Sequence, residues 1–428
     1  MDRDIKIGIS RNRLFDFQNV VSLVAEQKDD FDEKELSKAI RMLSVKEPLI
    51  TSVIELDENL EAFIQLERVT PEITFSEVDT EKFLTDKKAD GIDFSKGLFE
   101  FYVLNKKSLV ILSHTVVSDV KSLLLLAEEL LSYYNKESVS VEPQAIKLFS
   151  DDSELPGEIQ SFVAERVTEV LENDWLMKPV HFDKSDLNNA RTEFFKITGE
   201  LKSLEYCFSD ELSEKLVSRC EELKIDFSSC VAFAFLKALS ESVKSSRKTC
   251  KANMWLDRRP YFVDYKAYSV GAFNGTVSVD LPENKKSLDE QVKAFHENYY
   301  KKFTGCFNAF YNEFFLSRLS PCFIDSTYMY KVNRCKNKST KKLATLYGCE
   351  QQFLMGFTSV NLKQKSWEKL STFHHICVKE PHKSNENISL SLIMGEKNVL
   401  FMELFPTKFK GGNIDEILNR FEAILNQL

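Results

Sequence analysis

The sequence predicts an α/β protein with two similar halves, each of which combines strands and helices. The clearest evidence is the stretch 109–134, where an apolar, β-branched run predicts a buried strand that leads through a polar turn into a leucine-rich helix. From residue 204 onward, a strand followed by two helices begins a similar cycle. A chain of 428 residues is also long enough for two lobes of ordinary domain size.

The elements of the first half follow from local patterns. An acidic first turn and a spaced apolar stripe predict a helix, whereas β-branched residues after Pro48 predict an extended segment. The elements expected are, in chain order, a helix over 31–44, an extended segment over 49–56, a loop and then a strand within 83–101, a strand over 109–112, a polar turn over 113–119 and a helix up to residue 134.

The second half is expected to repeat this alternation after a crossover. The segment 175–202 shows few periodic signals and is predicted to be irregular, but its aromatic residues argue against a disordered linker. The remaining elements expected are helices over 158–171, 210–223, 227–243, 286–303 and 414–428, and strands over 204–208, 250–256, 276–279, 353–362 and, as a pair, within 388–405.

The polar turn carries the most informative motif in the chain. Its residues His114, Thr115 and Asp119 resemble the HHxxxDG motif of the CoA-dependent acyltransferase superfamily, which includes chloramphenicol acetyltransferase and the condensation domains of nonribosomal peptide synthetases. Aligned without gaps, His114 takes the first His position and Asp119 the Asp position. Thr115 stands where the family has its catalytic His, and Val120 stands where it has Gly. The motif is therefore degenerate.

The resemblance extends along most of the chain. The helix and strand over 31–56, the segment 83–101, the stretch Val270 to Asn274 and the strand 353–362 are each similar to family segments and occur in the family's order. The resemblance implies two chloramphenicol acetyltransferase-like lobes, each a mixed sheet with flanking helices, that meet in a V with a central tunnel. It divides the chain into an N-terminal lobe over 1–150, a crossover over 151–200 and a C-terminal lobe over 201–428.

The resemblance also implies a function. Members transfer an acyl group from a thioester of CoA, or of the phosphopantetheine of an acyl carrier protein, to an alcohol or amine acceptor, and no cofactor is expected to be tightly bound. Because the general-base His is missing, the alternative is a catalytically inactive binding or scaffold protein with the same fold. The chain begins at Met1 without a carrier or adenylation segment, so we expect a free-standing protein rather than one domain of an assembly.

The chemistry of the turn leaves two roles open for its histidine. A Thr hydroxyl does not ionise near pH 7, so Thr115 can orient a water or donate to an oxyanion but cannot replace a His base. Neighbouring side chains of a strand point to opposite faces, so His114 becomes the base only if a bulge re-aims it. Otherwise His114 is a structural, hydrogen-bonded residue.

Asp119 has two expected roles that do not exclude each other. In the family this Asp does not act on substrate but pairs with an Arg and holds the shape of the loop, and Arg258 and Arg259 are the candidate partners here. Asp119 also directly precedes a helix, where an Asp side chain caps free backbone N–H groups.

Other histidines and the basic segment 331–342 are weaker candidates. The pair His374–His375 is expected to lie in a strand, or else one ring lines the tunnel, and His181, His296 and His382 are expected at the surface. The segment 331–342, which contains Arg334 and no acidic residue, is either a solvated loop or a rim for the phosphates of a CoA or phosphopantetheine donor.

Composition excludes several classes. The net charge of −9 and the pI near 5.5 argue against a nucleic-acid-binding protein. We expect no membrane span and no signal peptide, because no apolar run is long enough and the N-terminus is charged. The nine Cys residues form no CxxC pair, so they predict reduced thiols in a cytoplasmic protein and argue against a zinc site.

Overall fold

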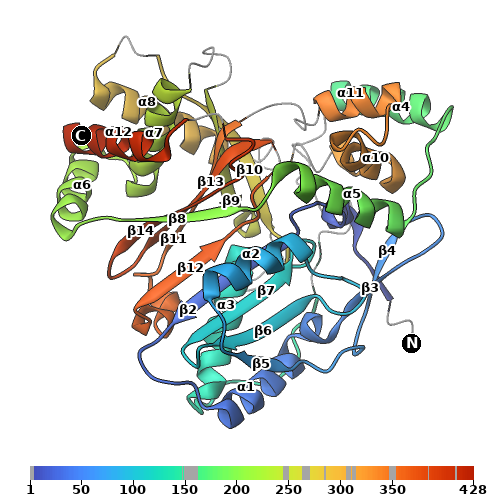
Figure 1. The fold of residues 1–428 in the computed structure, drawn as a ribbon, viewed down its shortest axis with the longest axis horizontal. Coiled ribbons are helices and arrows are strands. Elements are labelled where there is room, and N and C mark those ends of the chain that lie inside the picture. The colour runs from blue at the N-terminus through green and yellow to red at the C-terminus, as the bar shows by residue number, and fades with distance from the viewer. Residues whose placement is uncertain are drawn as a thin grey trace.

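A computed structural model describes most of the chain. The described residues are 4–146, 148, 162–243, 250–262, 270–283, 286–304, 310, 315–346, 353–383, 385–409 and 412–428. Residues 158–161, where the helix expected over 158–171 begins, lie outside them. Figure 1 shows the two large sheets in separate lobes, with helices packed on them.

The first lobe contains a five-stranded mixed sheet. Its strands, in spatial order, are β12 (His375–Lys379), β2 (Val20–Glu26), β7 (Ser108–His114), β6 (Phe99–Leu104) and β5 (Ile73–Ser76). The first four pair antiparallel and β5 pairs parallel with β6. Every residue of the central strand β7 is buried, which explains why its sequence is a continuous apolar run rather than an alternating one.

Three helices and a small sheet complete this lobe. The helices are α1 (Glu33–Lys46), α2 (Thr80–Asp90) and α3 (Val120–Tyr134), and the small sheet has the order β1 (Asp4–Lys6), β4 (Ala62–Gln65) and β3 (Val53–Leu56). Helix α3 packs on β2, β7 and α1 through its leucine stripe. Because β7 and α3 are both buried, the turn that joins them has rigid flanks.

The described part of the crossover is mainly helical. It contains α4 (Phe162–Leu176) and α5 (Lys184–Thr198), which pack against α11 (Lys338–Leu346) and α10 (Pro321–Lys331) respectively. The indole of Trp175 in α4 stacks on the ring of Phe323 in α10 at 4.8 Å between ring centroids. Figure 1 shows these four helices grouped at the upper right, with α5 lying above the first lobe.

The second lobe contains a six-stranded mixed sheet. Its strands, in spatial order, are β10 (Asn274–Asp280), β9 (Lys251–Asp257), β11 (Phe353–Asn361), β13 (Glu386–Met394), β14 (Asn398–Leu404) and β8 (Lys202–Cys207). Among the described residues, the helices beside this sheet include α6 (Asp210–Leu223), α7 (Phe227–Ser242), α8 (Leu288–Thr304) and α12 (Ile414–Gln427). Helix α7 is buried along most of its length because it packs against α12, α8 and β11 together.

The C-terminal half of the chain contributes one strand to the sheet of the first lobe. Strand β12 comes from the C-terminal half of the chain but pairs with β2 in the sheet of the first lobe. A buried ion cluster lies beside it, in which Lys88 of α2 and Lys379 of β12 both donate to Glu403 of β14. Backbone pairing and buried charges therefore both join the lobes.

The structure confirms the α/β class and corrects three local predictions. Residues 80–90 form a helix, not a loop, and residues 184–198 form a helix, not an irregular segment. The buried residue of α2 is Lys88, so no apolar stripe revealed it. For α5 the informative signals were its ends, a capping box between Asp183 and Asp186 and a C-terminal Gly199. The basic segment 331–342 is a loop only over 332–337, because Lys331 ends α10 and residues 338–342 belong to α11.

Candidate functional site

The segment 114–119, here called the motif turn, joins the last residue of β7 to the first of α3. Its backbone is fixed by neighbours, since the His114 N–H donates to the carbonyl of Leu98 and the Thr115 N–H to that of Asn19, both at 2.9 Å. His114, Thr115 and Asp119 are 0, 5 and 2 % exposed. Any ligand that reaches these side chains must therefore meet them in an almost closed environment.

The imidazole of His114 is a buried, neutral ring. The backbone N–H of Val116 donates to its Nδ1 at 3.2 Å, and the ring packs edge-on against Phe94 at 6.1 Å between centroids. Burial, aided by the positive charge of Arg191, lowers the pKa of His114 to about 3. Because Nδ1 accepts a hydrogen bond, the single proton of the neutral ring lies on Nε2, which is itself buried beside the backbone of Leu14. Neither nitrogen has a free lone pair to act as a base.

Thr115 follows His114 in the motif turn. Its Oγ1 is buried and has no hydrogen-bond partner within the part of the chain that the structure describes. The hydroxyl can therefore donate to a bound group, but its chemistry does not provide a base at neutral pH.

Asp119 makes both of the contacts expected from the sequence. Its two oxygens accept hydrogen bonds from the guanidinium of Arg259, each at 3.0 Å, and its Oδ1 accepts from the backbone N–H of Ser122 at 2.8 Å. Arg259 also pairs with Asp257 at 2.9 Å. The side chain of Arg258 turns elsewhere, donating from Nε to the carbonyl of Phe273 and lying over the ring of Phe310.

Glu380, which sequence reasoning missed, also contacts the start of α3. Its Oε1 accepts from the backbone N–H of Val120 at 3.1 Å, and its Oε2 accepts from Nδ2 of Asn274 at 2.8 Å. Burial, together with the negative charge of Asp119, raises its pKa to about 7. Glu380 follows β12 and lies 260 positions from Val120 in sequence, so only the strand exchange between lobes brings it here.

The other histidines lie outside this cluster. His375 is in β12, as expected, and its Nε2 lies 3.2 Å from Oε2 of Glu205. The strand prediction is wrong for His374, which lies just before β12 and 3.7 Å from Glu26. The surface prediction for His382 is wrong, since this residue is 2 % exposed and packs edge-on against Phe405, and burial lowers its pKa to about 4. His181 is exposed, and Nδ1 of His296 lies 3.0 Å from Oγ of Ser229.

The basic segment 331–342 is partly neutralised by the crossover. Arg334 pairs with Glu193 of α5 at 2.5 Å, and Lys342 pairs with Asp174 of α4 at 2.7 Å. Lys336, Lys338 and Lys341 remain exposed. Among the described residues, no group of His, Cys, Asp and Glu side chains has the arrangement of a metal site. No helix in the described ranges has the length and apolar character needed to cross a bilayer.

Comparison with solved structures defines the class of fold. This chain has the two-lobed fold of the condensation and epimerization domains of nonribosomal peptide synthetases, which confirms the chloramphenicol acetyltransferase-like architecture expected from the sequence. No family model matches the sequence, and no curated protein matches it. At the sequence identities involved, the likeness is one of fold.

Three structures illustrate the match. The epimerization domain from the third module of tyrocidine synthetase B is 12% identical and aligns over 100% of this chain and 97% of its own, with a TM-score of 0.60. The condensation domain of the Monacolin K polyketide synthase is 10% identical over 100% and 98%, with a TM-score of 0.63. Polyketide synthase associated protein 5 from Mycobacterium tuberculosis is 12% identical over 98% and 96%, with a TM-score of 0.61.

Proposed function

We propose that this protein binds acyl thioester ligands, presented by CoA or by the phosphopantetheine of a carrier protein, without using its motif turn as a general base. The observation that carries the proposal is the state of His114, a buried neutral ring whose Nδ1 already accepts a hydrogen bond. The fold it shares with condensation domains supports the ligand class.

His114 and Thr115, at the start of the motif turn, do not provide a base, whereas Asp119, at its end, holds the shape of the turn. Acyl transfer to an alcohol or amine requires a base within hydrogen-bond reach whose pKa lies near the working pH. His114, with a pKa of about 3, and Thr115 do not supply one. Asp119 and Arg259 form a buried bidentate pair that fixes the shape of the turn. The turn thus keeps the contacts that hold a site together and lacks those that move a proton.

Acyl transfer from the same thioesters to an alcohol or amine is the second candidate. The observation that favours it is Glu380, a carboxyl beside the motif turn with a pKa of about 7, which suits a general base. Each Glu380 oxygen already accepts one hydrogen bond and the side chain is buried, so an acceptor would have to reach a remaining lone pair. A catalytic His114 would likewise have to release the Val116 N–H and leave its buried position.

A thiol-release assay separates the two candidates. The protein is incubated with acetyl-CoA and longer acyl-CoAs and a panel of alcohols and amines, and free thiol is followed; binding of the same acyl-CoAs is measured by calorimetry. We expect saturable binding and no acceptor-dependent thiol release. Acceptor-dependent release that is lost in His114→Ala or Glu380→Gln would overturn the proposal, and activity gained in Thr115→His would show that the substrate sites are intact.

A further inference from the structure

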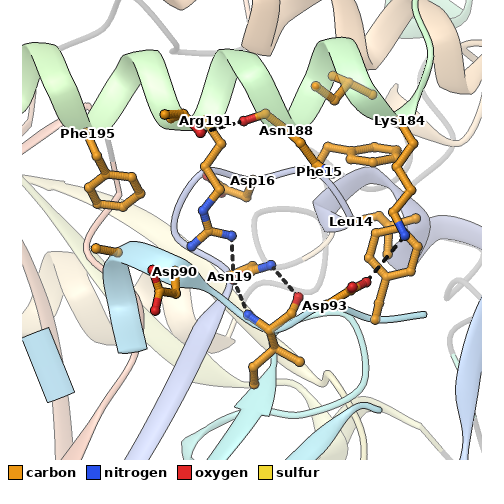
Figure 2. Close-up of a pocket in the computed structure, with 15 residues that line it drawn as sticks. Leu14, Phe15, Asp16, Asn19, Asp90, Asp93, Lys184, Asn188, Arg191 and Phe195 are labelled. Atoms are coloured by element: carbon orange, nitrogen blue, oxygen red, sulfur yellow. Dashed lines mark hydrogen bonds and ion pairs between the residues drawn. The ribbon is translucent and has the colours of Figure 1, made fainter. Parts of the chain in front are cut away.

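A cavity of about 470 Å³ lies between α5 and the first lobe (Figure 2). Its lining is about equally polar and apolar, and the apolar part is formed by Leu14, Phe15, Ile92, Phe94, Leu187 and Phe195. The motif turn does not line it, although Phe94 packs on the cavity at one side and on the ring of His114 at another. The volume is in the range of small-molecule sites in proteins.

Arg191 is the polar group that makes this cavity unusual. Its side chain points from α5 toward Asn19, as Figure 2 shows, with Nη1 donating to Oδ1 of Asn19 at 3.1 Å and Nη2 to the carbonyl of Lys88 at 3.0 Å. Its Nε is buried and has no hydrogen-bond partner, and no carboxylate of the described chain lies within ion-pair distance of it. A guanidinium has five N–H donors, so capacity for an acceptor remains.

The surroundings hold the guanidinium in place. Gly91 has a φ of +70°, and a Cβ at this position would lie 1.8 Å from Nη1 of Arg191, so a side chain here would displace the guanidinium. Asn19 is fixed in turn, because its Nδ2 donates to the carbonyl of Ile92 and its Oδ1 accepts from the Ile92 N–H, both at 3.3 Å. The charge of Arg191 is thus positioned by neutral groups.

The electrostatics of the cavity select the kind of anion. Burial lowers the pKa of Arg191 to about 10, although Asp16 and Asp90 oppose this shift, so the group is charged at pH 7 yet poorly compensated. Lys184 is already engaged by Asp93 at 3.3 Å and by Ser95 at 2.8 Å. The carboxylates of Asp16, Asp90 and Asp93 also line the cavity and disfavour a doubly charged phosphate. The aromatic rings of the lining favour a ligand with an apolar body.

We propose that this cavity is a binding site for a small monocarboxylic acid with an aliphatic or aromatic body. Its carboxylate would accept charge-assisted hydrogen bonds from Arg191, and its body would lie against Phe15, Phe94 and Phe195. The site does not depend on the function proposed for the motif turn, because none of its contacts involves the thioester chemistry.

Calorimetry on the full chain tests the site. Hexanoate and 3-phenylpropionate are titrated beside their amides, with inorganic phosphate as a separate probe. We expect saturable binding of one acid per chain and at least about tenfold weaker binding in Arg191→Met. The matched control is Arg166→Met, since Arg166 is exposed on α4 and pairs with Glu169; its Kd should equal that of the parent.

A second variant tests the site without changing Arg191, in case Arg191→Met does not fold. Asn188 is exposed at the cavity rim, so Asn188→Trp fills the opening while leaving Arg191 in place, and binding should be lost. Equal affinity for acid and amide, an unchanged Kd in Arg191→Met, tighter binding of phosphate than of either acid, or no binding of either acid would each overturn the proposal.

Discussion

Two arginines in this fold show how the same side chain serves different ends. Arg259, 2 % exposed in the second lobe, meets two carboxylates, those of Asp119 and Asp257. Arg191, beside the first lobe, meets a neutral amide and a carbonyl instead. Burial alone lowers the pKa of both guanidinium groups. The two carboxylates outweigh burial at Arg259, so its pKa is raised, whereas the pKa of Arg191 falls to about 10. The arginine with two carboxylate partners holds the motif turn, and the arginine with neutral partners is the proposed anchor for a ligand.

The same contrast separates the motif turn from the cavity. At the motif turn, the charged groups of Asp119, Arg259 and Glu380 all have protein partners, and the His114 ring is neutral. At the cavity, which Arg191 lines, the guanidinium donates to Asn19 and to the Lys88 carbonyl, and no carboxylate of the described residues lies within ion-pair distance of it. The charged groups at the motif turn thus hold its shape, whereas Arg191 lies at a separate cavity of the same lobe.

The largest effect is expected from Arg259→Met. The change leaves the buried carboxylate of Asp119 without its bidentate partner, which should lower the free energy of unfolding by about 3–5 kcal/mol. Urea unfolding followed by circular dichroism measures it. The control is Arg219→Met, whose partners are partly exposed and which should cost far less than Arg259→Met. Equal costs for the two variants would contradict a structural role for Arg259.

Glu403→Gln tests how much the buried ion cluster of Lys88, Lys379 and Glu403 stabilises the fold. The variant leaves the buried ammonium groups of Lys88 and Lys379 without their carboxylate and should cost about 2–4 kcal/mol at pH 7. In the parent, burial opposes ionisation of Glu403, but the two lysines outweigh it and lower its pKa to about 2. Because this pKa is lowered, the ionised Glu403 contributes its full stabilisation above the ordinary pKa of 4.5. This stabilisation is lost as the pH falls toward 2.

The pH dependence of unfolding checks that assignment. The parent should lose stability between pH 4.5 and pH 2 more steeply than Glu403→Gln does. As a control, Glu35→Gln removes a partly exposed carboxylate that pairs with Lys38 and Lys136 and should change the curve little. Parallel curves for the parent and Glu403→Gln would show that the cluster does not titrate in this range.

His114→Phe should change the pH dependence more than the stability at neutral pH. The folded-state pKa of about 3 lies below the ordinary 6.5, so the neutral ring stabilises the fold above pH 6.5 and this contribution is lost as pH falls toward 3. For a fully buried group the loss is about 2–3 kcal/mol between pH 6.5 and pH 4. Denaturant unfolding at several pH values should show it in the parent and in the surface control His181→Phe, but not in His114→Phe.

The smallest effect is expected from Arg191→Met in the absence of ligand. Because the guanidinium is poorly compensated, removing it should change the free energy of unfolding by about 1 kcal/mol or less, in either direction. Thermal unfolding of Arg191→Met and Arg259→Met, measured side by side, compares the two costs directly. A cost as large as that of Arg259→Met would mean that Arg191 is structural, as Arg259 is.

The sequence predicted elements whose signals are local. The apolar run and leucine stripe gave β7 and α3, and the motif gave the pairing of Asp119 with one of two arginines. Helix α5 was missed because its evidence lies in its caps rather than in a stripe. Glu380 and Arg191 were missed for a different reason. Their contacts, with Val120 and Asn19, join segments 260 and 172 positions apart, and depend on a strand exchange and a helical crossover that no local pattern encodes.

The most direct measurement of the central claim is the ¹⁵N NMR spectrum of the His114 ring across pH, assigned by comparison with His114→Phe. A ring protonated on Nε2, whose shifts do not change between pH 5 and pH 8, is the predicted result, because Val116 holds Nδ1 and burial keeps the pKa near 3. Titration of this ring with a pKa between 6 and 7 would contradict it and return His114 to the role of base.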